Sequence, residues 1–249
     1  MSRTTTPVYR VPLEIVNLGI TNYWDFGTGY ANLNSPIVAD RIDNLDVQWR
    51  GSAAVGGAYT TGEFSADFEA ANLDEVFTSN DKKLSASAIT ALTVFGWVKQ
   101  ETVGSGLVRN IISHWVGATN QRSFLIELDN LDKLRTFINS TGAAVNSTYT
   151  SDAAFSADLD WHFAVATFTA SAAMSMYKDG VPFASSLTAG SNIASIFAAT
   201  TTFEIGQNVS LTRRFDGKIG ICGIAVGKTM SDAEIATLYE LTNKIGNYR

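Results

Sequence analysis

Short runs of apolar and β-branched residues, separated by clusters of Gly, Asn, Asp and Ser, recur along the 249 residues of this chain. Long segments with the period of an amphipathic helix are scarce. Such runs are typical of strands, and several of them start about 8 to 15 residues apart, a spacing that favours an antiparallel sandwich over βαβ units. The sequence therefore predicts an all-β fold. The strongest strand candidates are residues 89–98, 110–115, 123–128, 134–138, 161–169, 173–177, 202–205 and 218–226.

Two turn sequences support antiparallel pairing. Asp179-Gly180 separates two short strand candidates, and Asp-Gly favours the positive φ angles of a tight hairpin. Residues 129–132, with the sequence Asp-Asn-Leu-Asp, separate the strand candidates 124–128 and 133–138. They predict a second hairpin with a four-residue connection.

One helix is predicted, near the C-terminus. Ser231 can cap its first turn while Glu234 reaches back, which is the S-x-x-E capping box. Apolar residues then follow on one stripe, so we expect this helix to lie as a lid on the sandwich. Gly246 can end it. The stripe consists of Ile235, Leu238, Tyr239 and Leu241.

The chain has the length of one large all-β domain, because sandwiches of about 200 to 250 residues are common. Residues 1–17 differ from the rest, with Pro7 and Pro12 ahead of the first aromatic cluster. We expect them to form an N-terminal arm, flexible or docked on a partner, ahead of a single domain over residues 18–249. The polar stretches 51–61, 142–156 and 185–195 are predicted to be large loops.

Composition excludes several classes of function. The single Cys222 leaves no intrachain disulfide and no multi-cysteine zinc site. A formal net charge of −6 and the lack of any basic block argue against a nucleic-acid partner. No apolar run reaches the roughly 18 to 20 residues of a membrane-spanning helix, and the first residues lack the apolar stretch of a signal peptide. The sequence thus predicts synthesis and release in the cytoplasm.

Several motifs occur in an order that is typical of one family. Leu92-Thr-Val-Phe-Gly-Trp-Val98 resembles the pattern F-T-V-x-x-W-V, and Trp161-His-Phe-Ala-Val-Ala-Thr167 resembles W-H-x-V-A-V-T. With the other motifs, they resemble a laminin G-like domain of the concanavalin A-like lectin and glucanase superfamily, from about Val16 onwards. The other matching segments are residues 20–26, 65–68, 72–76, 176–180, 203–206, 215–219 and 230–235.

The resemblance implies a two-sheet antiparallel jelly-roll β-sandwich with a short C-terminal helix. Trp97 and Trp161 lie in alternating apolar strands, where we expect their rings to fill the space between the sheets. The superfamily hosts lectins, adhesion modules, glycanases and structural domains, so the fold alone does not decide the function.

A glycanase is one hypothesis. Laminarinase-type relatives carry an E-x-D-x-x-E or E-x-D-x-E strand whose outer glutamates are nucleophile and general acid, and Glu127, Asp129 and Asp132 resemble it. Asp132 is shorter than the second glutamate, however, and Asp129 to Asp132 also fits a hairpin turn. We favour the turn and expect no enzymatic activity. The hypothesis predicts that Glu127→Gln destroys hydrolysis.

The resemblance also implies a calcium site, because many superfamily members bind Ca²⁺ through Asp, Asn and main-chain oxygens. The carboxylates that this chain offers do not have the spacing of an EF-hand loop, and solvated loop carboxylates are the alternative. The candidate ligands are Asp25, Asp40, Asp43 and Asp216.

A sugar platform is a further candidate site. An aromatic face can stack on a pyranose ring while amides and guanidinium groups bind its hydroxyls. His114, Trp115 and Arg122 lie close in sequence, and Tyr149 follows in a predicted loop. The alternative is an amphipathic strand in which Trp115 is partly buried.

We therefore expect a non-catalytic structural or recognition protein, exposed on a virion such as a bacteriophage head decoration, fibre or tail component. Virion proteins reach the outside by lysis, which agrees with the absent signal peptide, and residues 1–17 could dock on other virion proteins. The other expected partners are glycans and further copies of this chain in a homo-oligomer. The alternative is a carbohydrate-binding or adhesion module of a cell-surface or secreted protein.

Overall fold

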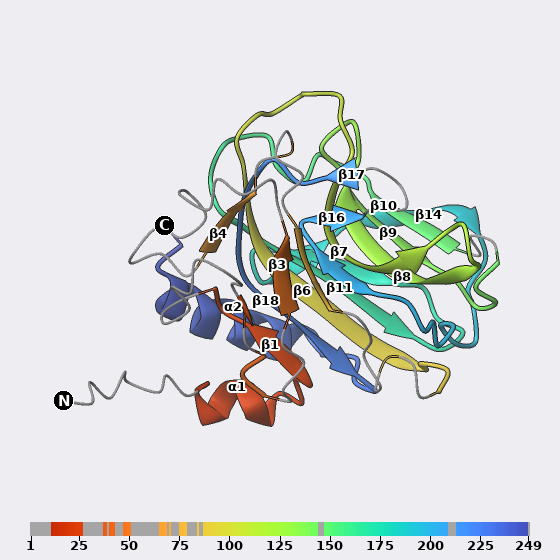
Figure 1. Ribbon diagram of the computed structural model, residues 1–249. Helices are drawn as coiled ribbons and strands as arrows, with labels where there is room; N and C mark the ends of the chain where they lie inside the picture. Colours follow the sequence, from red (N-terminus) through yellow and green to blue (C-terminus); the bar gives the residue numbers. More distant parts are fainter. Residues whose placement is uncertain are drawn as a thin grey trace, which may run out of the picture.

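Two antiparallel β-sheets pack face to face in the computed structural model of the protein (Figure 1). The structure describes residues 11–26, 37–38, 40–42, 47–50, 65–68, 70, 75–78, 84, 87–143, 147–208 and 213–248. Together with the C-terminal helix, this architecture confirms the predicted all-β sandwich.

The first sheet has seven strands, in the order β1-β18-β6-β11-β12-β13, with β4 also paired to β18. All of its pairs are antiparallel. Its strands are β1 (Asn22–Trp24), β4 (Ser65–Phe68), β6 (Ala91–Gln100), β11 (His162–Thr169), β12 (Ser175–Lys178), β13 (Val181–Phe183) and β18 (Gly217–Val226).

The second sheet has nine strands, in the order β14-β10-β9-β8-β7-β15-β5-β3-β2, and a small two-stranded sheet, β16-β17, accompanies it. The nine strands are β2 (Ile37–Val38), β3 (Val47–Arg50), β5 (Glu75–Thr78), β7 (Arg109–Val116), β8 (Gln121–Leu128), β9 (Leu134–Ile138), β10 (Ser147–Ser151), β14 (Ser185–Gly190) and β15 (Phe203–Ile205). The small sheet consists of β16 (Gln207–Asn208) and β17 (Arg213–Arg214).

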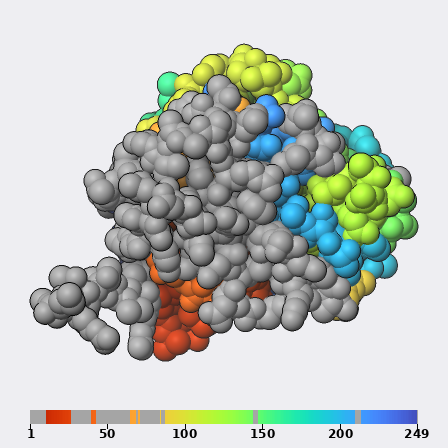
Figure 2. All heavy atoms as spheres, viewed as in Figure 1, coloured from red at the N-terminus to blue at the C-terminus, as the bar shows by residue number. Residues whose placement is uncertain are grey.

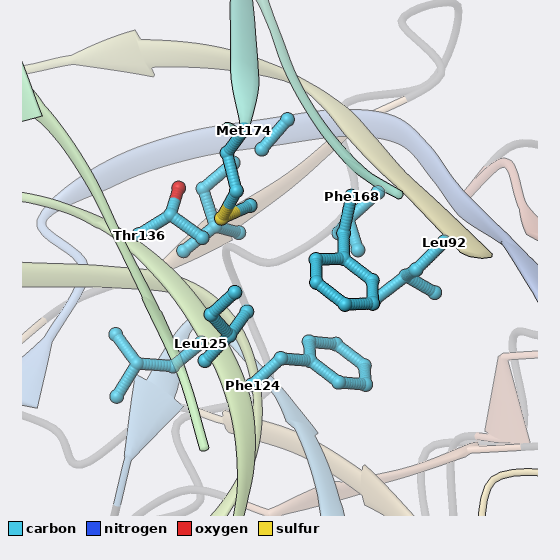
Figure 3. Close-up of a pocket in the computed structure, with 10 residues that line it drawn as sticks. Leu92, Phe124, Leu125, Thr136, Phe168 and Met174 are labelled. Carbon is cyan, nitrogen blue, oxygen red and sulfur yellow. The ribbon is translucent and has the colours of Figure 1, made fainter. Parts of the chain in front are cut away.

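The main hydrophobic core fills the space between the two sheets. Alternate residues of β8, namely Phe124, Ile126 and Leu128, point into it, as the period of two in a half-buried strand requires. Trp24 of the first sheet stacks on Phe203 of the second, with ring centroids 5.0 Å apart. A small apolar cavity of about 10 Å³ lies in this core, near Thr136 and Met174 (Figure 3). This volume is close to that of a single water, so the cavity cannot hold a sugar.

A second hydrophobic cluster lies under the two helices, α1 (Leu13–Asn17) and α2 (Asp232–Gly246), on the outer face of the seven-stranded sheet. The predicted capping box of α2 is confirmed, with Ser231 and Glu234 exchanging hydrogen bonds. Trp97 lies in this cluster, and its Nε1 donates to Oγ1 of Thr242 at 2.8 Å. The expectation that Trp97 and Trp161 fill the inter-sheet space was therefore wrong, because both rings lie on the α2 side.

Both predicted hairpins are present. The turn between β12 and β13 has positive φ at Asp179 and Gly180, 51° and 80°. A Cβ on Gly180 would lie 3.0 Å from the Tyr239 side chain, so this turn also needs glycine for the close approach of α2. In the turn between β8 and β9, Oδ1 of Asp129 accepts from the N–H groups of Leu131 and Lys133, at 2.8 and 3.0 Å.

Two of the polar stretches predicted as large loops contain strands. Residues 142–156 include β10 and residues 185–195 include β14, and these two strands pair with each other. Residues 51–61 lie outside the described residues, as do residues 1–10 of the predicted arm. The described part of the arm contains α1, in which Ile15 is buried. The boundary between residues 17 and 18 stays a prediction.

Candidate functional site

The outer faces of the two sheets differ. Helices α1 and α2 cover that of the seven-stranded sheet with a continuous apolar cluster. The outer face of the nine-stranded sheet carries polar and charged side chains of β7, β8 and β9, and the short strands β16 and β17 contact β7 there. In Figure 2, yellow-green residues of this sheet lie beside blue residues of the segment near β16 on the viewed surface. Most described side chains of β7 and β8 on this face are buried, and partly exposed side chains remain on β9 and β17, where a ligand can reach them.

Glu127 is the centre of a charged cluster on this face. It lies opposite Arg135 in the pairing of β8 with β9. Nε of Arg135 donates to Oε1 of Glu127 at 2.7 Å, and Nη1 of Arg213 in β17 donates to Oε2 at 2.6 Å. The Glu127 side chain is fully buried, whereas those of Arg135 and Arg213 are 20% and 25% exposed. The carboxylate thus holds two guanidinium groups at the surface.

Phe137 supports the same two arginines. It follows Arg135 by two residues and therefore lies on the same face of β9. The guanidinium carbons of Arg135 and Arg213 lie 5.2 and 5.7 Å from the centre of the half-buried Phe137 ring, within the range of a cation–π contact. Trp115 meets Phe137 edge to face at 6.0 Å. An aromatic support thus lies beneath the guanidinium pair.

Hydrogen bonds hold β16 against β7. Nδ2 of Asn208 donates to Oγ of Ser113 and to the carbonyl of Trp115, both at 3.1 Å. Nδ2 of Asn110 donates to the carbonyl of Gln207 at 2.9 Å. Because β17 pairs with β16, these bonds also fix the position from which Arg213 reaches Glu127.

The acidic residues of the glycanase hypothesis are engaged in other ways. Burial raises the pKa of Glu127, and the two guanidinium groups act in the opposite direction. Asp132 forms a buried ion pair with Arg109, with 2.8 Å between Oδ1 and Nη1. Asp129 binds the backbone of its own turn. A retaining hydrolase needs two accessible carboxyl groups on either side of the bond to be cleaved, and these three side chains offer no such pair.

The four residues of the predicted sugar platform do not converge. Trp115 is 3% exposed, on the outer face beside Phe137, and Tyr149 is 2% exposed, in the inter-sheet core with its hydroxyl bound to Asn192. His114 is buried against Phe124, and burial lowers its pKa to about 4. Arg122 is half-buried in the hairpin between β7 and β8 and donates to backbone carbonyls of residues 142 and 143. Their role in ligand binding stays a prediction.

Sequence reasoning missed Arg135, Phe137 and Arg213. The signal for the first two was available, because period-two alternation over the predicted strand 134–138 places Arg135 and Phe137 together on the face opposite Leu134, Thr136 and Ile138. Arg213 had no local signal, because its contact with Glu127 spans 86 residues.

The candidate calcium ligands that the structure describes bind protein donors. Oδ1 and Oδ2 of Asp40 accept from Tyr23 N, Ile42 N and Asn22 Nδ2 at 2.7 to 3.0 Å. Asp25 pairs with Arg41 at 3.1 Å, and Asp216 accepts from the backbone of residue 70. Asp43 lies outside the described residues. Within the described part of the chain, no three His, Cys, Asp or Glu side chains are grouped to hold a metal ion.

The described helices include none that is long and apolar enough to cross a membrane.

These features define the class of the protein. It is a lectin-like sandwich in which helices cover the outer face of one sheet and the outer face of the other sheet is polar. Residues 70–236 match the family model described as the concanavalin A-like lectin/glucanases superfamily. The chain belongs to this family, as the resemblance implied. Comparison with curated protein sequences gives no significant match.

Solved structures share the fold at low identity. The binding domain of botulinum neurotoxin serotype D/C is 13% identical with a TM-score of 0.64, and the match covers 90% of this chain and 52% of that one. The ligand-binding domain of serotype D, in complex with N-acetylneuraminic acid, is 16% identical with a TM-score of 0.62, covering 91% and 52%. A Trypanosoma rangeli sialidase is 11% identical with a TM-score of 0.59, covering 98% and 36%. The chain thus spans about half the length of the toxin domains.

Proposed function

We propose that this protein is a non-catalytic recognition module that binds a glycan on the outer face of the nine-stranded sheet. The observation that carries the proposal is the pair of partly exposed guanidinium groups of Arg135 and Arg213, held by Glu127 and Phe137 on the face that the helices leave open. Family membership supports it, and so does the similarity in fold to a domain solved in complex with a sugar.

The same geometry favours binding over catalysis. Glu127 is buried and paired twice, so it holds neighbouring groups in place instead of reaching a substrate. A glycan bound here would contact the edges of the guanidinium groups and the rim of Phe137. Planar guanidinium groups are suited to such contacts because they donate several hydrogen bonds in a fixed fork.

We further propose that the module is displayed on a virus particle, such as a bacteriophage head, fibre or tail. The support is compositional: the strands are rich in Ala, Ser, Thr and Gly, and charged residues make up 17% of the chain. Mass spectrometry of purified particles tests this proposal, with many copies per particle expected. Removal of residues 1–10, which keeps the buried Ile15, is expected to prevent incorporation without unfolding the sandwich. Recovery of the protein only as a free or cell-bound species would contradict display.

Glycan binding is tested on a panel of immobilised neutral and acidic glycans. The unmodified protein is expected to retain a subset of the panel, and Phe137→Ala is expected to lose that retention because both arginines lose their support. Lys244→Gln is the control variant, because Lys244 lies on the exposed side of α2, which covers the seven-stranded sheet and not the proposed site. We expect it to retain the same glycans as the unmodified protein. If no glycan is retained, or if Phe137→Ala binds as well as the control, the proposed site is wrong.

A further inference from the structure

The guanidinium pair keeps hydrogen-bond donors that are not bound by any residue in the described part of the chain. Arg135 binds Glu127 through Nε and Nη2, and Arg213 binds it through Nη1. This leaves Nη1 of Arg135, and Nε and Nη2 of Arg213, without a hydrogen-bond partner among the described residues. A guanidinium group stays charged at every physiological pH, so these donors must be met by water or by a ligand.

The position of the two groups strengthens their attraction for an anion. Each side chain is about three-quarters buried, with one edge open to solvent. A charge that is partly removed from water acts through a lower effective dielectric constant, so its attraction for an opposite charge is greater than on a fully solvated side chain.

The charge balance of the cluster is positive in an acidic protein. Among the described residues of this cluster, two guanidinium groups face the one carboxylate of Glu127, so the cluster keeps one positive charge, whereas the whole chain has a net charge of −6. Glu127 is fully buried beneath the arginines, so an approaching ligand meets the guanidinium edges first. A neutral sugar would bring both donors and acceptors to these groups. A carboxylate or sulfate brings only acceptors and matches the fork geometry.

The cluster is also held rigidly before a ligand arrives. Arg135 is fixed by its cross-strand partner Glu127, and Arg213 by the same carboxylate and by the attachment of β16 to β7. Phe137 lies against both guanidinium groups. Binding therefore costs little additional side-chain entropy, which favours a specific contact.

We propose that the ligand of this face is an acidic glycan, whose carboxylate or sulfate group is bound jointly by Arg135 and Arg213. The inference rests on the proposed function and names its ligand class. Arg135 and Arg213 are the contacting residues, and Glu127 and Phe137 are positioning residues.

Three probes with a common neutral core test the proposal by isothermal titration calorimetry: lactose, 3′-sialyllactose and 3′-sulfolactose. We expect at least one acidic probe to bind about tenfold or more tightly than lactose, because a charge-assisted hydrogen bond contributes about that factor. We also expect the affinity for the acidic probe to fall as NaCl is raised, since the contact is partly exposed.

Variants locate the contact. Arg213→Gln and Arg135→Gln are each expected to weaken binding of the acidic probe by about tenfold or more, and to weaken it by a larger factor than any binding of lactose. Arg213→Lys keeps the charge and can still pair with Glu127, so it is expected to remain folded and to lose a few-fold in affinity as the fork geometry is lost. Lys244→Gln, which also removes one positive charge, serves as the control. Circular dichroism confirms the fold of each variant.

The possible failures are distinguishable. Equal affinity for lactose and the acidic probes would overturn the acidic ligand class while glycan binding stands. Acidic binding that neither arginine variant weakens would overturn this site. If none of the three probes binds and no glycan of the panel is retained, both the inference and the proposed function are wrong.

Discussion

Nδ1 of His162 lies 2.9 Å from Oδ2 of Asp179, and its other ring nitrogen, Nε2, lies 2.9 Å from Oδ1 of Asp158. Carboxylate oxygens only accept hydrogen bonds when ionised, so both ring nitrogens must carry a proton. The geometry thus requires an imidazolium ion that connects β11 to the turn after β12 and to the loop before β11.

The first prediction concerns the titration of His162. Burial lowers the pKa of His162, but its hydrogen bonds to Asp179 and Asp158 raise it by more, so the pKa lies above the ordinary value of 6.5. The stabilisation from this group is therefore fully present below about pH 6.5 and is lost as the pH rises through the folded-state pKa. Nuclear magnetic resonance of the ring protons measures it directly, and a folded-state pKa below 6.5 would refute the imidazolium clamp.

His114 should titrate in the opposite direction. It is buried, and its pKa is lowered to about 4, so it is neutral in the folded protein at pH 6. Since the unfolded chain takes up this proton more readily, stability is lost as the pH falls from about 6.5 towards 4, by up to about 3 kcal/mol. The chain has only two histidines, so one spectrum resolves both titrations. A His114 ring that titrates near pH 6.5 would contradict its burial.

Asp132 connects three loops at one end of the sandwich. Its carboxylate accepts from Arg109 Nη1 at 2.8 Å and from Gly104 N at 2.6 Å, and its carbonyl accepts from Phe155 N at 2.8 Å. Asp132→Ala leaves the buried Arg109 charge without its ion-pair partner, so we expect a loss of about 3 to 5 kcal/mol in the free energy of unfolding.

Urea denaturation measures this loss, and Asp160→Asn, at an exposed carboxylate of a neighbouring loop, is the matched control. A loss below about 1 kcal/mol in Asp132→Ala would mean that the ion pair adds little beyond its desolvation cost.

Thr136 offers a stabilising change. Its Oγ1 is buried without a hydrogen-bond partner among the described residues, and the side chain lines the small apolar cavity with Met174 and Phe168 (Figure 3). Thr136→Val replaces this hydroxyl with a methyl group of similar size. We expect the free energy of unfolding to rise by about 1 kcal/mol, as seen in the midpoint of thermal unfolding. A lower midpoint would show that a partner such as a bound water satisfies the hydroxyl.

The sequence pattern was sufficient to predict the fold, but it predicted only part of the candidate site. Alternation and turn chemistry are local, so the strands, the Asp179-Gly180 turn and the Ser231 cap could be predicted. The strands β10 and β14 could not, because Ser and Thr strands lack an apolar signal and are defined by pairing with each other. Trp97 was misplaced for a similar reason. In a strand that is buried on both faces, alternation does not tell which sheet face a ring occupies.

The site depended on contacts that are distant in sequence. Trp115 and Tyr149 were chosen for their chemistry, yet tertiary packing buried both. Arg213 joined Glu127 only through the pairing of β16 with β17.

The most direct test of the account is to map ligand binding onto the protein by amide chemical-shift perturbation with 3′-sialyllactose. We expect the largest shifts in β8, β9 and β17, around Glu127, Phe137 and Arg213, and none in α2. Shifts confined to α2 or to the seven-stranded sheet, or no shifts at millimolar ligand, would contradict the claim that the outer face of the nine-stranded sheet is a glycan-binding surface.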